Sequence, residues 1–284
     1  MQDLRRVGPP REQVDDPDAA TERLRRFLLD HRPLVLTGAG ISVAAGLPAY
    51  RDATGQWQHA QPMQHRDFLG SDAARRRYWS RAMLGWRAFS AAAPSPVHRS
   101  LARWQHAERI GLIVTQNVDA LHQRAGSIDV LDLHGRLDTV VCLDCQAESP
   151  RSAMQDRLEA ANPDRVTPLA RVVKPDGDTG VDTVDADFRL PACERCGGRL
   201  KPDVVFYGDT VPRARVDAVK AALDTAGALL VIGSSLSVYS GYRVARWAAE
   251  SGFPTVLVNP GVTRADPLAD VRLAVDAQTV LPTV

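Results

Sequence analysis

Short apolar runs alternate with helical patterns along most of this chain of 284 residues. Uninterrupted apolar strands that alternate with helices are typical of a parallel sheet covered by helices on both faces. The sequence therefore predicts an α/β fold with a Rossmann-like parallel sheet. The predicted strands lie at 34–37, 111–115, 204–207, 228–232 and 255–259.

Each predicted strand ends in a cluster of glycine or polar residues. The clusters read Thr-Gly-Ala-Gly, Thr-Gln-Asn-Val-Asp, Tyr-Gly-Asp, Gly-Ser-Ser and Asn-Pro-Gly in chain order. Ligands of parallel sheets bind outside the carboxyl ends of the strands. We therefore expect one ligand site at this edge of the sheet.

Composition argues against several classes of partner. The 35 basic and 34 acidic residues give a net charge of +1, which indicates no affinity for nucleic acid. No apolar run approaches the ~20 residues that span a bilayer. The first residues lack the apolar core of a secretory signal and include acids, which transit peptides avoid. We expect a cytoplasmic protein that binds neither nucleic acid nor membrane.

The four cysteines form two Cys-x-x-Cys pairs, Cys142 with Cys145 and Cys193 with Cys196. Two such pairs together supply the four thiolates of a tetrahedral zinc site, and a filled coordination shell makes the metal structural. Two disulfides or four free thiols are the alternatives. A chain of this length can build a core without disulfides, so we predict one structural Zn²⁺.

Two segments interrupt the alternation and suggest a domain organisation. Residues 53–95 predict a small helical module, and residues 138–202, which hold the cysteines, predict a zinc-binding module. We expect a discontinuous Rossmann-like domain at 18–137 and 203–284. Residues 1–17, rich in proline and charge, predict a flexible lead.

The first glycine cluster combines Gly38 and Gly40 with Ser42 and Gly46. A dinucleotide-binding G-x-G-x-x-G motif has its third glycine three residues after the second, whereas Gly46 comes six residues after Gly40. This spacing argues against an NAD oxidoreductase. Unobstructed backbone N–H groups at a helix N-terminus would still suit a pyrophosphate, and a tight strand-to-helix turn is the alternative.

Further polar residues follow the other predicted strands. Gln116, Asn117 and Asp119 can orient a carboxamide and ribose hydroxyls, although Asn and Asp also cap helices. His134 precedes Gly135, where a neutral imidazole could act as a general base or be an ordinary core residue. The clusters at 233–235 and 259–261 suit phosphate and ribose, or are simple turns.

Together, in this order, these motifs resemble the sirtuins along nearly the whole chain. Residues 77–81, 142–145 and 238–243 resemble the class II branch of this family. That branch includes mitochondrial sirtuin 4 and bacterial deacetylases. The matching stretches are 38–42, 46–48, 50–51, 115–122, 133–135, both cysteine pairs, 201–209, 233–236 and Asn259.

The resemblance implies an NAD-dependent protein lysine deacylase that consumes NAD as a co-substrate. His134 would deprotonate a ribose hydroxyl after the acyl oxygen has displaced nicotinamide. Gln116 and Asn117 would hold the ribose and a water, and Asp119 the nicotinamide amide. The alternatives are protein mono-ADP-ribosyl transfer in the same cleft and a non-catalytic scaffold that binds NAD or zinc. The oligomeric state stays open.

The resemblance also implies a wider set of contacts. An acylated-lysine protein substrate would pair as a strand with the backbone of Val205, Phe206, Tyr207 and Gly208, opposite the segment after Ser235. Cofactor contacts would come from Gly38, Ala39, Gly40, Ser42, Gly46, Tyr50, Arg51, Gly233, Ser234, Ser235, Asn259, Pro260, Gly261 and Ala277.

Four positions bear on affinity and selectivity. Ala49 replaces the usual aspartate of the family pattern, and Pro260 removes one N–H donor, so cofactor affinity is in question rather than the reaction. Tyr78 and Arg81 share a helix face by their spacing, and Arg81 could pair with an acidic acyl group in an acyl pocket. A packed tyrosine and a surface arginine are the alternative.

Overall fold

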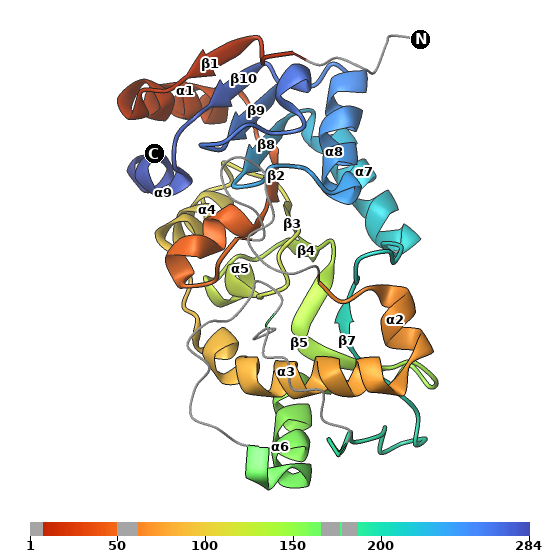
Figure 1. The fold of residues 1–284 in the computed structure, drawn as a ribbon. Coiled ribbons are helices and arrows are strands. Elements are labelled where there is room, and N and C mark those ends of the chain that lie inside the picture. Colours follow the sequence, from red (N-terminus) through yellow and green to blue (C-terminus); the bar gives the residue numbers. More distant parts are fainter. Residues whose placement is uncertain (1–7, 50–61, 166–176, 178–186) are drawn as a thin grey trace.

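A seven-stranded parallel sheet is the main element of the computed structural model, which describes residues 8–49, 62–165, 177 and 187–284 (Figure 1). This confirms the predicted sheet. The central strands are buried along their whole length, which explains their uninterrupted apolar sequence. In spatial order the strands are β1 (Glu12–Val14), β10 (Val271–Leu273), β9 (Thr255–Val258), β8 (Leu229–Ile232), β2 (Leu34–Thr37), β3 (Ile113–Thr115) and β4 (Val130–Asp132).

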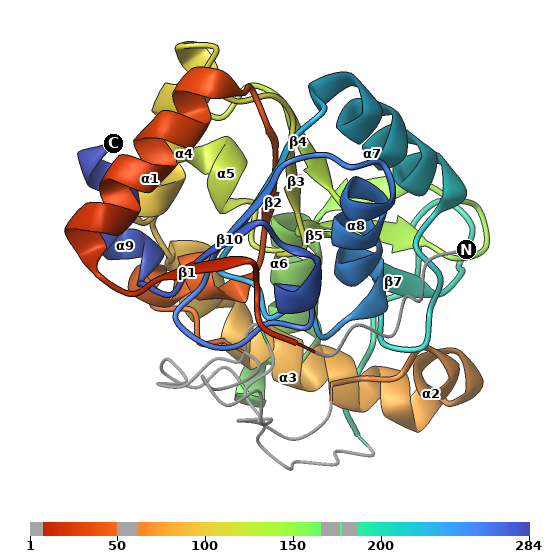
Figure 2. The ribbon, with the colours of Figure 1, turned by 90° about the horizontal axis from the view of Figure 1, so that it is seen from above.

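Helices cover both faces of this sheet (Figure 2). On one face, α1 (Pro17–Asp30), α4 (Pro96–His106) and α9 (Ala277–Val280) pack on one core cluster. On the other, α7 (Arg213–Ala226) and α8 (Tyr239–Glu250) pack on a second. None of the helices in the described part of the chain is long and apolar enough to cross a membrane.

A second, smaller module lies next to the edge of the sheet that β4 forms (Figure 1). It contains a three-stranded antiparallel sheet packed with helices around Phe68, Trp79 and Met154. The indole Nε1 of Trp79 donates to the carbonyl of Leu200 at 3.1 Å, which ties helix to sheet. The elements are β5 (Gly135–Cys142), β6 (Glu148–Pro150), β7 (Leu200–Val204), α2 (His65–Gly70), α3 (Asp72–Ala91) and α6 (Arg151–Ala161).

Shorter elements complete the described chain. The helix α5 (Leu121–Arg124) follows β3 and contributes Leu121 to a core cluster with Phe89 and Leu137. The 3-10 helices lie at Ala39–Ala45, Pro163–Arg165, Asp266–Leu268 and Leu281–Thr283.

The structure corrects two expectations. Residues Glu12–Val14 were predicted to belong to a flexible lead, but they form an edge strand because their backbone pairs with β10. Since β10 lies near the other end of the chain, the local sequence does not indicate this contact. The run at 204–207 is not a strand of the parallel sheet, since β7 ends at Val204 and pairs with β5 instead. The helix expected after the β2 turn is the 3-10 helix Ala39–Ala45.

Two buried histidines lie beneath the loop that follows β2. The rings of His98 and His122 have centroids 4.9 Å apart, and both side chains are buried. His122 Nε2 lies 2.9 Å from Thr37 Oγ1, and the Ser95 N–H donates to His98 Nδ1. Burial lowers the pKa of His98 to about 4 and that of His122 well below its usual value, so both rings are neutral at pH 7.

We expect these histidines to make the fold sensitive to acid. The pKa of His98 is lower in the folded chain than in the unfolded chain, so the unfolded chain binds the extra proton between about pH 6.5 and pH 4. Stability is therefore full above this window and falls as the pH drops through it, by about 3 kcal/mol from His98 alone.

Denaturant unfolding at pH 7 and at pH 4.5 measures this loss. The His98→Gln variant cannot titrate at this position, so its free energy of unfolding should fall less over the same interval. An equal fall in the variant and the wild type would show that His98 does not carry the effect.

Candidate active site

A cavity of about 340 Å³ opens where β2, β3, β8 and β9 end. Its position at the carboxyl ends of parallel strands is the one expected for a ligand site. The predicted site residues that line it are Gly38, Ala39, Gly40, Gln116, Asn117, His134, Tyr207, Gly233, Ser234, Ser235, Asn259, Pro260, Gly261 and Ala277.

Glycines from two loops form one wall of this cavity by close backbone contact. The Gly40 N–H donates to the Gly233 carbonyl at 2.9 Å. A Cβ on Gly40 would lie 2.8 Å from that same oxygen, and a Cβ on Gly38 would lie 2.7 Å from Ser234 Cβ. Gly233 has a φ of +61°, which side chains disfavour. Glycine is therefore required here, and the backbone remains accessible to a ligand.

The amides that follow β3 are anchored to the same two loops. Gln116 Nε2 donates to Ser234 Oγ at 2.9 Å and to the Thr37 carbonyl at 3.3 Å. Asn117 Nδ2 donates to the Gly38 carbonyl and to Ser42 Oγ, both at 3.1 Å. Both side chains are thus held at the cavity wall before any ligand binds.

Asp119 and Ser42 face a smaller cavity of about 20 Å³ next to the first. The Ser42 hydroxyl donates to Asp119 Oδ2 at 2.7 Å, and the Leu121 N–H donates to Oδ1 at 2.9 Å. Burial raises the pKa of Asp119, and these two hydrogen bonds counter it. Ala39, Gln116 and Asn117 line both cavities.

The hydrogen bonds of His134 fix its tautomer. Its Nδ1 lies 2.9 Å from the Gln116 carbonyl, which can only accept, so Nδ1 carries the hydrogen. Its Nε2 is then an acceptor and receives the Ser240 hydroxyl at 2.7 Å. Burial lowers the pKa of His134, so the ring is neutral at pH 7. A neutral imidazole with an unprotonated Nε2 at a cavity wall is equipped to act as a general base.

The residue after His134 must be glycine. Gly135 has a φ of +78°, and a Cβ there would lie 1.9 Å from the Asp203 carbonyl oxygen. The Val205 N–H donates to the His134 carbonyl at 2.8 Å. The main chain of His134 is therefore held by the segment that follows β7.

The predicted substrate-binding segment at 205–208 contacts helix α2 and lines the cavity through Tyr207. Tyr207 lines the cavity, and its carbonyl accepts the His65 N–H at 2.9 Å, so this part of the backbone already has a partner. The buried Tyr78 packs on Phe206 with ring centroids 5.3 Å apart, and Arg81 is half-buried on the same helix.

Three predicted cofactor-binding residues are not among the described residues that line the cavities, and several cavity-lining residues were not predicted. Tyr50 and Arg51 lie outside the described residues, and Gly46, with a φ of +85°, ends the 3-10 helix without lining either cavity. Sequence reasoning gave Ser240 no role, although it lies in the stretch 238–243 that resembles the class II branch and at the start of α8. It also missed the cavity-lining residues Val43, Ser237, Val238, Val262 and Asp276.

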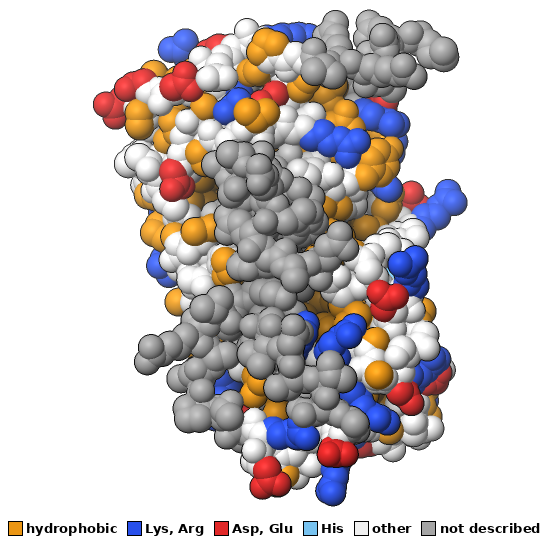
Figure 3. All heavy atoms as spheres, viewed as in Figure 1, with side chains coloured by type: hydrophobic (Ala, Val, Ile, Leu, Met, Phe, Trp, Pro, Cys, Tyr) orange, Lys and Arg blue, Asp and Glu red, His pale blue; other side chains and the backbone are white. Residues whose placement is uncertain are grey.

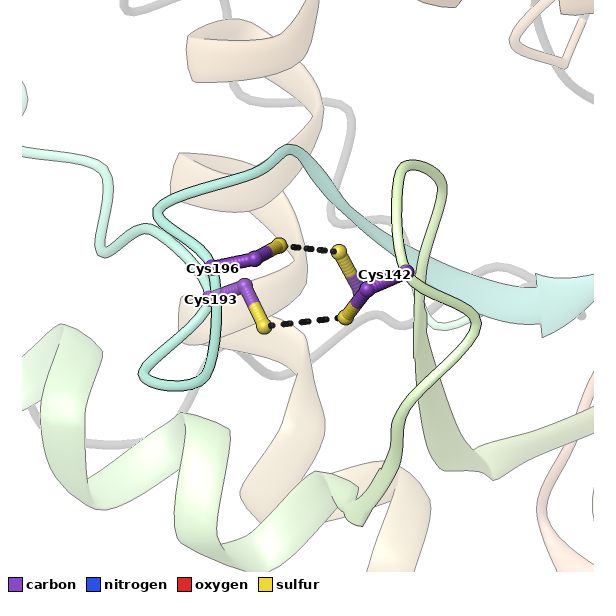
Figure 4. Close-up of side chains that lie close together, drawn as sticks. Cys142, Cys193 and Cys196 are labelled. Atoms are coloured by element: carbon purple, nitrogen blue, oxygen red, sulfur yellow. Dashed lines mark hydrogen bonds between the residues drawn. The ribbon is translucent and has the colours of Figure 1, made fainter.

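The four cysteine sulfurs form a compact cluster between two loops (Figure 4). All lie within 4.8 Å of one another, with 3.6 Å between Cys142 and Cys196 and 3.8 Å between Cys145 and Cys193. Four thiolates around Zn²⁺ at ~2.3 Å are about 3.8 Å apart, whereas a disulfide needs ~2.05 Å. The cluster fits a structural zinc ion and not a pair of disulfides.

Zinc at this cluster should be measurable and should stabilise the fold. We expect about one zinc per chain by elemental analysis, and Cys196→Ala should lose most of it together with several kcal/mol of stability. Ser152→Ala, an exposed change on α6, is the control and should keep the metal. Purified chain without zinc, with four reactive thiols and unchanged stability, would contradict this assignment.

Comparison with known proteins agrees with this geometry. The model of the Sir2 family matches residues 38–240. An NAD-dependent protein deacetylase of Bordetella bronchiseptica is 48% identical over 265 residues, covering 93% of this chain and 96% of the relative. The mitochondrial NAD-dependent protein lipoamidase sirtuin-4 of Bos taurus is 43% identical over 288 residues, covering 99% and 91%.

Solved structures give the same result. A Sir2 structure with a p53 peptide and NAD⁺ aligns with a TM-score of 0.72 at 26% identity, covering 93% of this chain and 96% of the other. A Sir2 structure bound to a propionylated peptide aligns with a TM-score of 0.73 at 26% identity and the same coverage. The glycine loops, the polar residues after β3, His134 and the cysteine cluster thus occur in a chain that belongs to the Sir2 family.

Proposed function

We propose that this chain is an NAD-dependent protein lysine deacylase, which transfers the acyl group of a modified lysine to ADP-ribose and releases nicotinamide. The observation that carries the proposal is the neutral His134, whose unprotonated Nε2 lies at the wall of a cavity built from glycine loops. The deacetylase activity named for the Bordetella relative supports the same reaction class.

The cavity residues suit NAD. The close contact of Gly40 with Gly233 leaves no room for a Cβ, so backbone groups can approach a pyrophosphate. Ser234 and Asn259 supply polar side chains on the β8 and β9 sides, for the phosphates and the adenosine half. When bound, NAD supplies the ribose carbon that accepts the acyl oxygen and the nicotinamide that leaves.

His134 then receives a proton at Nε2 from a ribose hydroxyl, which makes that hydroxyl oxygen a nucleophile. The Ser240 hydroxyl donates to Nε2 in the resting site, so it must turn away or accept from the new N–H. The Gln116 carbonyl accepts from Nδ1, and this hydrogen bond strengthens when the ring becomes charged. The chain thus orients the base and stabilises its protonated form.

Asn117 and Asp119 act on the nicotinamide side of the site. Asn117 is held by Gly38 and Ser42, so its side chain is placed to orient the ribose and a water. Asp119 is fixed by Ser42 and the Leu121 N–H and can accept from a carboxamide. We assign the acylated lysine to the end of the cavity near Tyr207, which lines it together with His134.

Replacing His134 tests the reaction. Mixed with NAD and acetylated, lipoylated and glutarylated lysine peptides, the wild type should release nicotinamide and form acyl-ADP-ribose by mass spectrometry. His134→Ala should lower acyl removal at least about a hundredfold, as expected for a lost general base. His106→Ala, an exposed histidine on α4, is the matched control and should keep full activity.

Two outcomes would contradict the proposal. Full deacylation by His134→Ala would remove the base from its assigned role. ADP-ribose attached to protein, with no loss of acyl groups, would assign the cavity to mono-ADP-ribosyl transfer instead.

A further inference from the structure

Exposed apolar side chains gather at the mouth of the main cavity. Among the described residues, the exposed large apolar side chains are Leu29, Val43, Ile128, Val238, Tyr239 and Val262. Val43, Val238 and Val262 line the cavity, and Tyr239 directly follows Val238. Apolar surface that is concentrated at a site opening, rather than scattered singly, indicates a binding surface.

Two arginines lie beside these apolar residues and stack on tyrosines. The Arg264 guanidinium is 4.1 Å from the Tyr242 ring centroid, and the Arg243 guanidinium is 5.1 Å from the Tyr239 centroid. Arg264 is held further by its own N–H, which donates to the Ser235 carbonyl at 2.9 Å. Figure 3 shows Lys and Arg side chains next to hydrophobic ones over the region of α8. Stacking fixes these charges in place before a partner arrives.

These charges are not neutralised by the described part of the chain. No carboxylate of the described residues forms an ion pair with Arg243 or Arg264, whereas the neighbouring Arg246 pairs with Glu250 at 3.1 Å. Elsewhere on the surface, Arg213 pairs with Asp217 and Arg87 with Glu159. The net charge of the chain is only +1, so these two arginines, unpaired within the described chain, are a local positive feature. Arg264 reaches the cavity lining through the Ser237 carbonyl at 3.4 Å, and Asp276 also lines the cavity.

We propose that this rim binds acidic residues of the substrate polypeptide next to the acylated lysine. The rim is the surface formed by Val238, Tyr239, Tyr242, Arg243, Val262 and Arg264. A polypeptide that delivers its lysine side chain to His134 must pass the cavity mouth, where the lining residues Val238 and Val262 are exposed. Carboxylates beside that lysine would pair with Arg243 and Arg264 while apolar atoms contact Val238 and Val262.

This inference rests on the proposed deacylase function and adds a substrate class to it. Nucleic acid and anionic membranes are weaker candidates, since they would carry no acyl-lysine into the cavity that this rim surrounds. Because Arg264 is exposed and Arg243 is only half-buried, each ion pair should contribute little, and salt should weaken the effect.

Matched peptides test the rim. One acetyl-lysine peptide carries glutamates on both sides of the lysine, and its partner carries glutamines at the same places. We expect kcat/KM to be about five-fold higher for the acidic peptide at low salt, mainly through KM, and the ratio to approach one in 0.5 M salt.

Variants assign the effect to the rim. Arg264→Gln and Arg243→Gln should bring the ratio of acidic to neutral peptide close to one. Arg213→Gln, which removes an exposed arginine on α7, should leave that ratio as in the wild type. Equal kcat/KM for the two peptides in the wild type, or an acidic preference that survives in both rim variants, would overturn the proposal.

A binding measurement separates failure of the rim from failure of the reaction. Fluorescence anisotropy of the labelled peptides in the presence of NAD needs no turnover. Tighter binding of the acidic peptide that is lost in Arg264→Gln supports the rim even if no peptide is deacylated, in which case the proposed function alone fails. Binding of duplex DNA or phosphatidylserine vesicles that exceeds acidic-peptide binding and depends on Arg264 would overturn the rim proposal.

Discussion

The site depends on one close contact between two loops at the carboxyl ends of β2 and β8. Gly40 donates to the Gly233 carbonyl, and neither position has space for a Cβ that points at the other loop. Other wall residues are positioned from these loops: Gln116 is anchored through Ser234, and Asn117 through the Gly38 carbonyl. A side chain at this contact would therefore displace the backbone of both loops and the amides together.

His134 lies where the parallel sheet meets the antiparallel sheet. Its ring is oriented by the Gln116 carbonyl from the loop after β3, and its main-chain carbonyl is held by Val205 after β7. The strand that begins next to it, β5, ends at Cys142 in the four-cysteine cluster. The cluster therefore lies at the far end of the strand that begins next to His134, away from the cavity.

Features set by local sequence were predictable, and features set by distant contacts were not. The apolar runs predicted most strands of the parallel sheet, and the Cys-x-x-Cys spacing predicted the sulfur cluster. Strand β1 was not predictable, because Glu12–Val14 show no apolar pattern and pair with β10 near the other end of the chain. The contact of Ser240 with His134 joins residues 106 positions apart, so no local pattern reveals it.

We propose that the loops at 38–40 and 233–234 hold NAD so that its nicotinamide ribose faces His134 Nε2. A crystal structure with NAD and an acetyl-lysine peptide tests it most directly. We expect the pyrophosphate against Gly38, Gly40 and Gly233, and a ribose hydroxyl within hydrogen-bond distance of His134 Nε2. A pyrophosphate bound away from these glycines, or a ribose that His134 cannot reach, would contradict it.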